Sequence, residues 1–255
     1  MDGLNDRQRQ IVELIRQSGQ QSINALSEAF GVATQTIRRD INDLCEQGLA
    51  RRVHGGVAPP SNPLNLNFRA RRILNEGPKR AIARAAADLI PDGSCVLLGI
   101  GTSVQYVAEA LMDRPDMSFV TNNIEVATLL CSAPSAEVHI VGGTLRPEDR
   151  DIVGAGALRG FSRFVADVAV IGAGALDAEF GILDFKPFDA EVGQTLLAQC
   201  RTSMLVADHS KWSRTARHRV AGFDMVDLFV TDALPPDQAG SWGHIAPKTR
   251  LEQAG

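Results

Sequence analysis

The sequence lacks the features that mark membrane, secreted and zinc-binding proteins. No apolar run approaches the roughly 20 residues that cross a bilayer, and the N-terminus carries no basic segment followed by an apolar one. The four cysteines are far apart and form neither a Cys-x-x-Cys pair nor a Cys/His cluster, which argues against a disulfide framework and a metal site. We therefore expect a soluble cytoplasmic protein with reduced cysteines, no metal and no cofactor.

A large net charge is also missing. The formal charge of −4 argues against non-specific coating of polyanions, although a local basic patch can still bind DNA. The length of 255 residues allows two domains. A stretch rich in proline and asparagine separates two differently patterned regions. We expect a first domain over residues 1–57, a linker over residues 58–77 and a second domain over residues 78–255.

The stretch from Ser22 to Gly56 has the pattern of a winged helix-turn-helix. A helix over about 23–30 turns Leu26, Ala29 and Phe30 inward and ends at Gly31, a residue that accepts positive φ. The next helix has Thr34 as its expected N-cap and an apolar stripe at helical spacing formed by Ile37, Ile41 and Leu44. The β-compatible residues 49–53 then lead into a hairpin wing whose turn is expected at His54, Gly55 and Gly56.

The opposite face of the second helix carries side chains that recognise DNA bases. Gln pairs bidentately with adenine and Arg with guanine, and each good pair contributes about 1–3 kcal/mol of discrimination. We expect bases to be contacted by Thr34, Gln35, Thr36 and Arg39, with Asn42 on the same face. Phosphates are expected to be contacted by Arg38, Arg51 and Arg52. The alternative is a small helical hairpin with a solvated charged face that binds no DNA.

The second region alternates strand-like and helix-like segments. Helices are expected over 78–90 and 104–111, and strands over 94–98, 117–121, 137–141, 165–171, 202–207 and 225–230. Such alternation predicts βαβ units and an α/β, Rossmann-like domain with a mostly parallel sheet covered on both faces.

Polar or glycine-rich loops follow five of these strands. In an open parallel sheet, ligands bind outside the carboxyl ends of the strands. The first loop opens a helix, so its backbone N–H groups are suited to an anion. No loop completes a Walker or GxGxxG motif, which disfavours nucleotides. We expect a small phosphorylated ligand to bind Gly101, Thr102, Ser103, Thr121, Asn122, Asn123, Gly142, Gly143, Gly174, Asp177, Asp208 and Lys211.

Several segments together resemble one family of bacterial regulators. TQTIRRDINDLCEQGLARRVHGG, GIGTS, VTNN, VGGTLR and VADHSKW resemble the DeoR family over essentially the whole chain. The resemblance implies a winged-helix head and a sensor domain with the fold of sugar-phosphate isomerases such as ribose-5-phosphate isomerase. It also implies a repressor that releases operator DNA when it binds a phosphorylated effector.

Within the family, VTNN, VADHSKW, LDF at residues 183–185 and MVDLFVTDALPP are most similar to repressors of glycerol 3-phosphate regulons. This similarity makes glycerol 3-phosphate the expected effector. The chain departs from the family at Gly99, where an aspartate is usual in the segment DxGTT, and Ser103 stands for the last threonine. The missing carboxylate is expected to alter a hydroxyl contact of the ligand.

We expect a homo-oligomer, a dimer or tetramer, because one head reads too few base pairs for specific binding. Three alternatives stay open. The chain could regulate another sugar-phosphate operon, or it could be an activator. It could also be a sugar-phosphate isomerase with a DNA-binding head, its acid and base drawn from Asp177, Asp184, Asp189 and Glu191.

Overall fold

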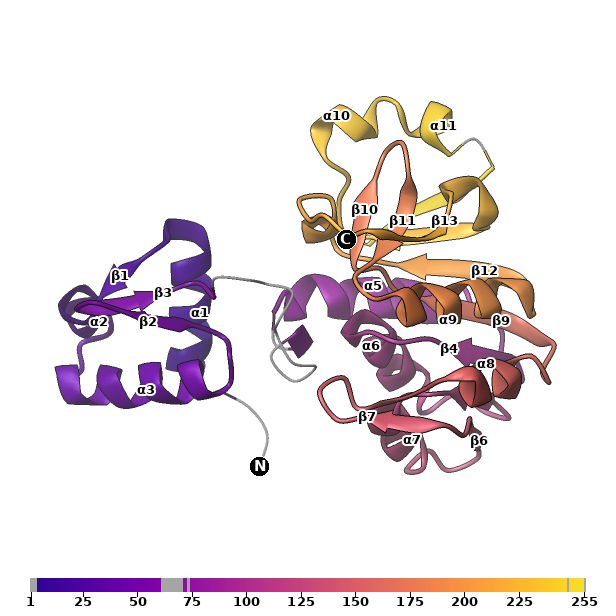
Figure 1. Ribbon diagram of the computed structural model, residues 1–255, viewed down its shortest axis with the longest axis horizontal. Coiled ribbons are helices and arrows are strands. Elements are labelled where there is room, and N and C mark those ends of the chain that lie inside the picture. Colours follow the sequence, from indigo (N-terminus) through magenta and orange to yellow (C-terminus); the bar gives the residue numbers. More distant parts are fainter. Residues whose placement is uncertain (1–3, 61–70, 73, 247, 255) are drawn as a thin grey trace. The chain divides into compact units, whose positions relative to one another are not determined.

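The computed structural model describes residues 4–60, 71–72, 74–246 and 248–254. The chain divides into two compact units, Met1–Leu74 and Asn75–Gly255, which we call the head and the sensor (Figure 1). Most of the expected linker, residues 58–77, lies outside the described residues. The expected domain boundaries therefore stay predictions.

Three helices and a small antiparallel sheet form the head. The elements are α1 (Asp6–Ser18), β1 (Gln21–Ser22), α2 (Ile23–Phe30), α3 (Thr34–Glu46), β2 (Arg51–Val53) and β3 (Gly56–Ala58). The strand order is β1-β3-β2. One apolar cluster joins the helices, with fully buried side chains from each: Ile11, Ile15, Leu26, Ile37, Ile41 and Leu44. The winged helix-turn-helix predicted from the sequence is thus the fold of the head.

Local hydrogen bonds fix where the head helices begin. The side chain of Asn5 caps α1 in a capping box with Gln8, and the Ser22 hydroxyl accepts a hydrogen bond from the N–H of Ala25 at 3.1 Å. The expectation that Thr34 caps α3 is wrong. Ala33 is the N-cap residue, its extended backbone makes the turn into the helix, and no side chain caps the helix.

Two other details of the head differ from expectation. Ala29 is exposed rather than inward, and Leu26 is the buried residue of α2. Gly56 is the first residue of β3, so the turn of the wing is confined to His54 and Gly55.

A seven-stranded parallel sheet forms the centre of the sensor, in the order β15-β14-β12-β9-β4-β5-β6 (Figure 1). Its strands are β4 (Cys95–Leu98), β5 (Ser118–Thr121), β6 (Glu137–Ile140), β9 (Ala166–Ile171), β12 (Cys200–Val206), β14 (Leu228–Thr231) and β15 (Arg250–Gln253). All six expected strands are present, and the predicted α/β class with a mostly parallel sheet is confirmed.

Helices cover both faces of this sheet. They are α5 (Glu76–Asp88), α6 (Thr102–Leu111), α7 (Ile124–Leu130), α8 (Ala155–Phe161) and α9 (Pro187–Ala198). Alternate strand residues face opposite sides. Leu97, Ala169 and Leu205 pack in one core with α8 and α9, whereas Val96, Val168 and Met204 pack in the other with α5, α6 and α7.

Short additional strands lie outside the central sheet and were not expected from the sequence. β7 (Thr144–Arg146) and β8 (Asp151–Val153) form a hairpin. β10 (Ala175–Asp177), β11 (Gly181–Asp184) and β13 (His218–Ala221) form an antiparallel sheet. Single turns of 3-10 helix follow at η2 (His209–Lys211) and η3 (Phe223–Met225), and two short helices lie near the end, α10 (Pro236–Ala239) and α11 (Trp242–Ile245). No described helix is both long and apolar enough to cross a bilayer.

Candidate functional site

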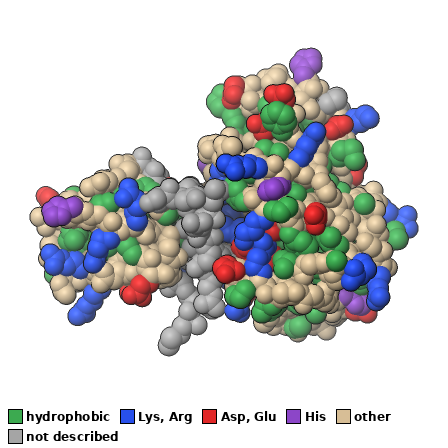
Figure 2. All heavy atoms as spheres, in the orientation of Figure 1, with side chains coloured by type: hydrophobic (Ala, Val, Ile, Leu, Met, Phe, Trp, Pro, Cys, Tyr) green, Lys and Arg blue, Asp and Glu red, His purple; other side chains and the backbone are tan. Residues whose placement is uncertain are grey.

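The outer face of α3 presents polar side chains to solvent. Gln35, Arg38 and Arg39 are exposed, as is Thr34, while Thr36 is half-buried. The opposite stripe of α3 is fully buried in the head core. Basic side chains are visible on the surface of the head in Figure 2. The structure therefore brings the expected base-reading residues together on one exposed surface.

Polar contacts from α1 fix the orientation of α3. The guanidinium of Arg7 donates from Nε to Oδ2 of Asp40 at 2.6 Å, and Gln8 donates from Nε2 to Oδ2 of Asp43 at 3.0 Å. The Asp40 carboxylate is buried, whereas the Arg7 side chain is partly exposed. These contacts hold the inner side of α3 and leave its outer side available.

The wing is joined both to β1 and to α3. A Cβ atom on Gly56 would lie 2.1 Å from the carbonyl oxygen of Gln21, so only glycine lets β3 approach β1 this closely. Arg51 and Arg52 are exposed on β2. Arg52 donates a hydrogen bond to the side-chain oxygen of Asn42, which links the wing to the exposed face of α3.

In the sensor, neighbouring strands bring the expected loops to one edge of the sheet. β12, β9, β4 and β5 are adjacent and parallel, so the segments after them lie in the same order along the carboxyl edge. After β4, Gly101 has a φ of 120° and precedes α6, whose first residues Thr102 and Ser103 are buried. The N-terminus of α6 offers backbone N–H groups to an anion, but an anion site also needs positively charged or polar side chains at the same edge.

A cluster of charged and polar side chains supplies such groups; we call Asn75, Lys79, Asp208, Ser210 and Lys211 the Asp208 cluster, in which Lys79 and Asp208 are buried. Oδ1 of Asp208 accepts hydrogen bonds from Asn75 Nδ2 at 2.7 Å and from the Ser210 hydroxyl at 2.5 Å. Burial alone would raise the pKa of Asp208, but the charge of Lys211, the Ser210 hydrogen bond and the charge of Lys79 lower that pKa to about 2. Asp208 is therefore ionised between two lysines.

Lys79 is a member of the Asp208 cluster that was not expected from the sequence. It lies in the first turn of α5 and is only 3% exposed. Lysine is rarely buried to this extent without a charged partner. Its position three residues before the buried Ile82 was the available signal, because that spacing places it on the inner side of the helix.

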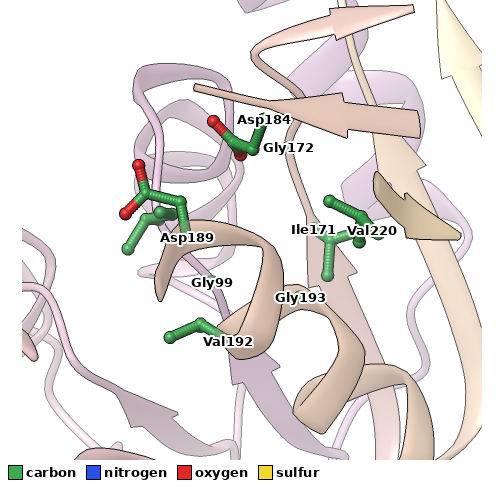
Figure 3. A pocket seen from close by; sticks show the side chains of 9 residues that line it. Gly99, Ile171, Gly172, Asp184, Asp189, Val192, Gly193 and Val220 are labelled. Atoms are coloured by element: carbon green, nitrogen blue, oxygen red, sulfur yellow. The ribbon is translucent and has the colours of Figure 1, made fainter. Parts of the chain in front are cut away.

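A pocket opens beside this edge, between the sheet and α9 (Figure 3). The residues that line it come from the ends of β4, β9, β11 and β13 and from α9: Gly99, Ile100, Ile171, Gly172, Asp184, Asp189, Val192, Gly193 and Val220. The departure from the family pattern at Gly99 thus lies in the pocket wall. Two of the four carboxylates considered for an isomerase, Asp184 and Asp189, line the pocket, whereas Asp177 and Glu191 do not.

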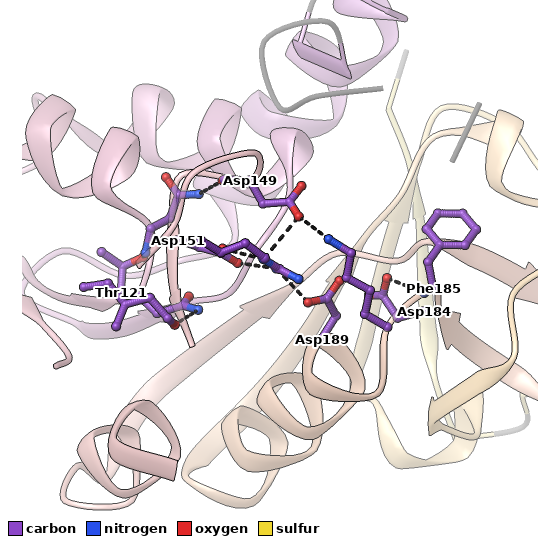
Figure 4. Close-up of polar contacts among 11 residues, drawn as sticks. Thr121, Asp149, Asp151, Asp184, Phe185 and Asp189 are labelled. Carbon is purple, nitrogen blue, oxygen red and sulfur yellow. Dashed lines mark hydrogen bonds and ion pairs between the residues drawn. The ribbon is translucent and has the colours of Figure 1, made fainter. Parts of the chain in front are cut away.

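An ion network adjoins the pocket (Figure 4); we call Arg146, Asp149, Asp151, Lys186 and Asp189 the Arg146 network. Arg146 Nη2 donates to Asp151 at 2.6 Å and to Asp189 at 2.8 Å, and its Nε donates to Asp151 at 2.9 Å. Asp149 lies 3.2 Å from Arg146 and accepts from Lys186 at 2.8 Å. The network joins the β7–β8 hairpin to the start of α9.

Burial and charge act in opposite directions on Asp189. Burial raises the pKa of the Asp189 carboxyl, and the Arg146 guanidinium counteracts part of that rise. The three nearby carboxylates raise the pKa of Arg146 despite its burial.

Several expected effector residues do not line the pocket. Asn122 donates from Nδ2 to the carbonyl of Ile152 at 3.0 Å, and Asn123 caps α7 through the N–H of Val126 at 3.1 Å. The Thr121 hydroxyl accepts from the N–H of Asn123 at 3.1 Å. These three residues therefore hold the β7–β8 hairpin and α7 in place at the carboxyl edge.

The glycines and Asp177 have local roles of the same kind. A Cβ atom on Gly143 would lie 2.5 Å from the carbonyl oxygen of Val153 across the hairpin, while Gly142 has open space around it. Gly174 donates to the carbonyl of Leu183 at 3.0 Å. Asp177 accepts hydrogen bonds from the N–H groups of Glu179 and Phe180 and thus closes the turn between β10 and β11. No group of residues in the described part of the chain has the composition of a metal site.

Two family models match the chain, one in each unit. Residues 7–62 match a DeoR-like helix-turn-helix domain, and residues 74–233 match the DeoR C-terminal sensor domain.

Curated relatives resemble the chain over nearly its full length. The HTH-type transcriptional repressor CsqR of Escherichia coli is 39% identical over 250 residues, which are 98% of this chain and 93% of the relative. The glycerol-3-phosphate regulon repressor of Escherichia coli is 38% identical over 230 residues, 90% of this chain and 91% of the relative. Among solved structures, the sorbitol operon regulator SorC of Klebsiella pneumoniae matches with a TM-score of 0.38 and 16% identity, covering 82% of this chain and 91% of that chain.

Proposed function

The chain belongs to the DeoR family of transcriptional repressors, and on that premise we propose that its head binds operator DNA until a small phosphorylated effector binds the sensor. The observation that carries the sensor half of this proposal is the Asp208 cluster, which places two lysines beside the carboxyl edge of a parallel sheet. The exposed polar face of α3 carries the other half.

In the head, Thr34, Gln35, Thr36 and Arg39 contact base edges in the major groove, and Arg38, Arg51 and Arg52 contact phosphates. Gln and Arg offer bidentate hydrogen bonds to adenine and guanine. The bond from Arg52 to Asn42 favours a positioning role for Asn42 over base reading. A wing arginine on a strand is suited to the backbone, because phosphate contacts set register and carry no sequence information.

Binding of the full chain to a pool of random duplexes separates these roles. Arg51→Ala should weaken binding to all sequences nearly equally and reduce the slope of log affinity against log salt by about 1. Gln35→Ala should instead relax the sequence preference at one position. A changed sequence preference in the Arg51 variant, with an unchanged salt slope, would contradict the phosphate role.

We assign the operator-bound state to a homo-oligomer, a dimer or tetramer, because a single recognition helix contacts few base pairs and repeated half-sites give the required specificity. Sedimentation of the full chain with and without a selected duplex measures the number of copies. A single copy that binds its operator with full specificity would refute this assignment.

In the sensor, the phosphate of the effector binds Lys79, Lys211 and the N-terminal end of α6 at Thr102 and Ser103. Glycerol 3-phosphate is the proposed effector, supported by the 38% identity to a repressor named for the glycerol-3-phosphate regulon. Regulation of another sugar-phosphate operon is the second candidate, because Gly99 in the pocket wall replaces the usual family aspartate.

Calorimetric titration tests the effector. Glycerol 3-phosphate should bind the full chain and lower its affinity for the selected duplex, whereas unphosphorylated glycerol should do neither. Lys79→Gln and Lys211→Ala should each weaken the binding. If ribose 5-phosphate or a fructose phosphate binds instead, the phosphate site stands and the glycerol assignment falls.

The regulatory reading is preferred over an isomerase. The chain's family and its relatives named as repressors support it, and the pocket retains only Asp184 and Asp189 of the four carboxylates that an isomerase was expected to use. Conversion of ribose 5-phosphate by the purified chain, abolished by Asp189→Asn, would restore the enzyme hypothesis.

A further inference from the structure

The strand β6 lies at one end of the central sheet and has an open side (Figure 1). β5 pairs with one side of β6, and in the described part of the chain no strand pairs with the other. Glu137 and Val141 donate their backbone N–H groups to carbonyl oxygens on the β5 side. Successive residues of a strand direct these groups to opposite sides, so the N–H and C=O groups of Val138 and Ile140 point away from β5.

The residues with outward backbone groups have aliphatic side chains. Val138 is partly buried and packs against the core that contains α7. Ile140 lies two residues further along the strand, hence on the same face of the sheet, and is 49% exposed. An apolar edge strand with free N–H and C=O groups is a template for pairing with another chain, and natural proteins usually cover or protect such a strand. β6 therefore has the properties of a strand that receives a partner.

The strand at the other end of the sheet has a different character. β15 carries Arg250 and Glu252, which form an ion pair at 3.2 Å with both side chains exposed. Charged side chains on an edge strand oppose the addition of a further strand. β6 has one carboxylate, that of Glu137 at its first residue, and Oε1 of Glu137 lies 3.3 Å from Nε2 of His139. Of the two end strands, β6 is thus the one suited to pairing.

We propose that two copies of this chain join through β6, so that their central sheets form one continuous sheet across a twofold axis. A twofold axis perpendicular to the sheet makes the two β6 strands antiparallel. Two opposed residues of an antiparallel pair exchange two hydrogen bonds when the N–H and C=O groups of both point toward each other. Val138 of one copy therefore pairs with Ile140 of the other, and the axis repeats this pair.

The same register suits the side chains. The axis keeps α7 of both copies on one face of the joined sheet, so Ile140 packs against the partner subunit's Val138 and loses its exposure to water. Aliphatic side chains opposed in this way stabilise a strand pair. On the other face, His139 meets its own copy at the axis. Glu137 lies opposite the aliphatic side chain of the partner subunit's Val141, so no carboxylate faces another.

A second copy is the partner that this strand fits best. A twofold interface uses the same surface of both subunits and must be self-complementary. The outward groups of Val138 and Ile140 meet that condition, because each residue offers one donor and one acceptor to the other. This inference rests on the homo-oligomer proposed above and adds the surface through which two copies meet.

Sedimentation of the full chain over a range of concentrations tests the surface. Ile140→Lys should raise the dissociation constant of the β6 contact at least about tenfold, equivalent to about 1.4 kcal/mol, because it brings an ammonium group against an aliphatic side chain. If the wild-type chain is a tetramer, the variant should sediment as a dimer. Gln253→Lys is the matched control on β15, where Gln253 is exposed, and it should leave the association unchanged. Thermal unfolding of both variants identifies any loss of folding.

Cysteine cross-linking tests the register. The variants are made with Cys131→Ser, since Cys131 is an exposed cysteine. His139→Cys should form a disulfide-linked dimer with diamide, because opposed residues without mutual hydrogen bonds have Cα atoms about 4.5 Å apart, a distance that a disulfide spans. Ile140→Cys should not, because the two copies of residue 140 are diagonal neighbours about 7–8 Å apart, beyond the reach of a disulfide.

The outcomes separate this inference from the proposed function. Selective weakening by Ile140→Lys together with cross-linking of His139→Cys supports the β6 contact. If Ile140→Lys associates as tightly as Gln253→Lys, or if His139→Cys cross-links no faster than Ile140→Cys, the β6 contact is refuted while the homo-oligomer stands. If the wild-type chain stays a single copy with and without a selected duplex, the homo-oligomer and the inference both fail.

Discussion

Replacing Arg146 with methionine should destabilise the sensor by about 3–5 kcal/mol, the usual cost of removing one partner from a buried ion pair. Methionine keeps much of the aliphatic volume of arginine but removes its charge. The Arg146 side chain is 14% exposed, and its hydrogen-bonded partners Asp151 and Asp189 are 1% and 10% exposed. Both carboxylates would stay buried without their cation. Urea unfolding followed by circular dichroism at pH 7.5 measures the loss.

The same variant should regain stability as the pH falls. Burial already raises the pKa of Asp189, and Arg146 is the charge that opposes this rise. Without Arg146 the folded state holds the proton of Asp189 to higher pH than the unfolded state, whose aspartate pKa is about 3.9. Stability is then lost as the pH rises above that value. The deficit of Arg146→Met should therefore be smaller at pH 5 than at pH 7.5.

Arg150→Met is the control on the same hairpin segment. Arg150 pairs with Glu125 at 2.8 Å, but the two side chains are 47% and 28% exposed, and such pairs contribute about 0–1 kcal/mol. Equal losses in the two methionine variants would refute the argument from burial. A deficit of Arg146→Met that grows toward low pH would refute the assigned sign.

Three further predictions concern substitutions that each alter a single contact. Asp208→Asn should lower the free energy of unfolding at pH 7 by about 2.6 kcal/mol, since the pKa of Asp208 is about 2 in the folded state and about 3.9 when unfolded. Unfolding at pH 7 and pH 3 should show the difference from wild type fading at the lower pH. Ser22→Ala should cost the head about 1 kcal/mol by removing the cap of α2, measured by thermal unfolding. Gly56→Ala should disrupt the β1–β3 contact, because its Cβ would lie 2.1 Å from a carbonyl oxygen, and weaken duplex binding measured by fluorescence anisotropy.

Elements whose apolar pattern lies within one continuous stretch of the chain could be predicted from the sequence alone. The apolar stripe of α3 and the six expected strands of the central sheet could be predicted from periodicity. The cap of α3 could not, because the backbone of Ala33 makes the turn without a side-chain bond. The sheet formed by β10, β11 and β13 was missed because it pairs β11 with β13 across more than 30 residues of sequence, and no local pattern indicates such a pairing.

The site was predictable in outline only. The strand order brings the expected loops to one edge, but which side chains line the pocket depends on contacts between distant segments. Arg146 and Asp189 are 43 residues apart, and no spacing rule connects them. Lys79 was overlooked because lysine is usually a surface residue. Asp177 was expected at the ligand, whereas its carboxylate accepts backbone hydrogen bonds in a turn.

Asp189 belongs both to the pocket lining and to the Arg146 network, and this affects how effector preference can evolve. Asp189 lines the pocket and also holds Arg146, so a substitution there alters ligand affinity and folding stability together. Selection removes many such changes, because natural proteins lie only a little above the stability they need. Gly99 lines the same pocket without a side chain in the Arg146 network, and a Cβ atom there would meet the Leu196 side chain at 3.2 Å and the carbonyl oxygen of Val170 at 3.3 Å, so a small side chain needs only a shift of a few tenths of an ångström. New preferences should therefore arise more readily at position 99, with Asp189 retained across lineages that respond to different ligands.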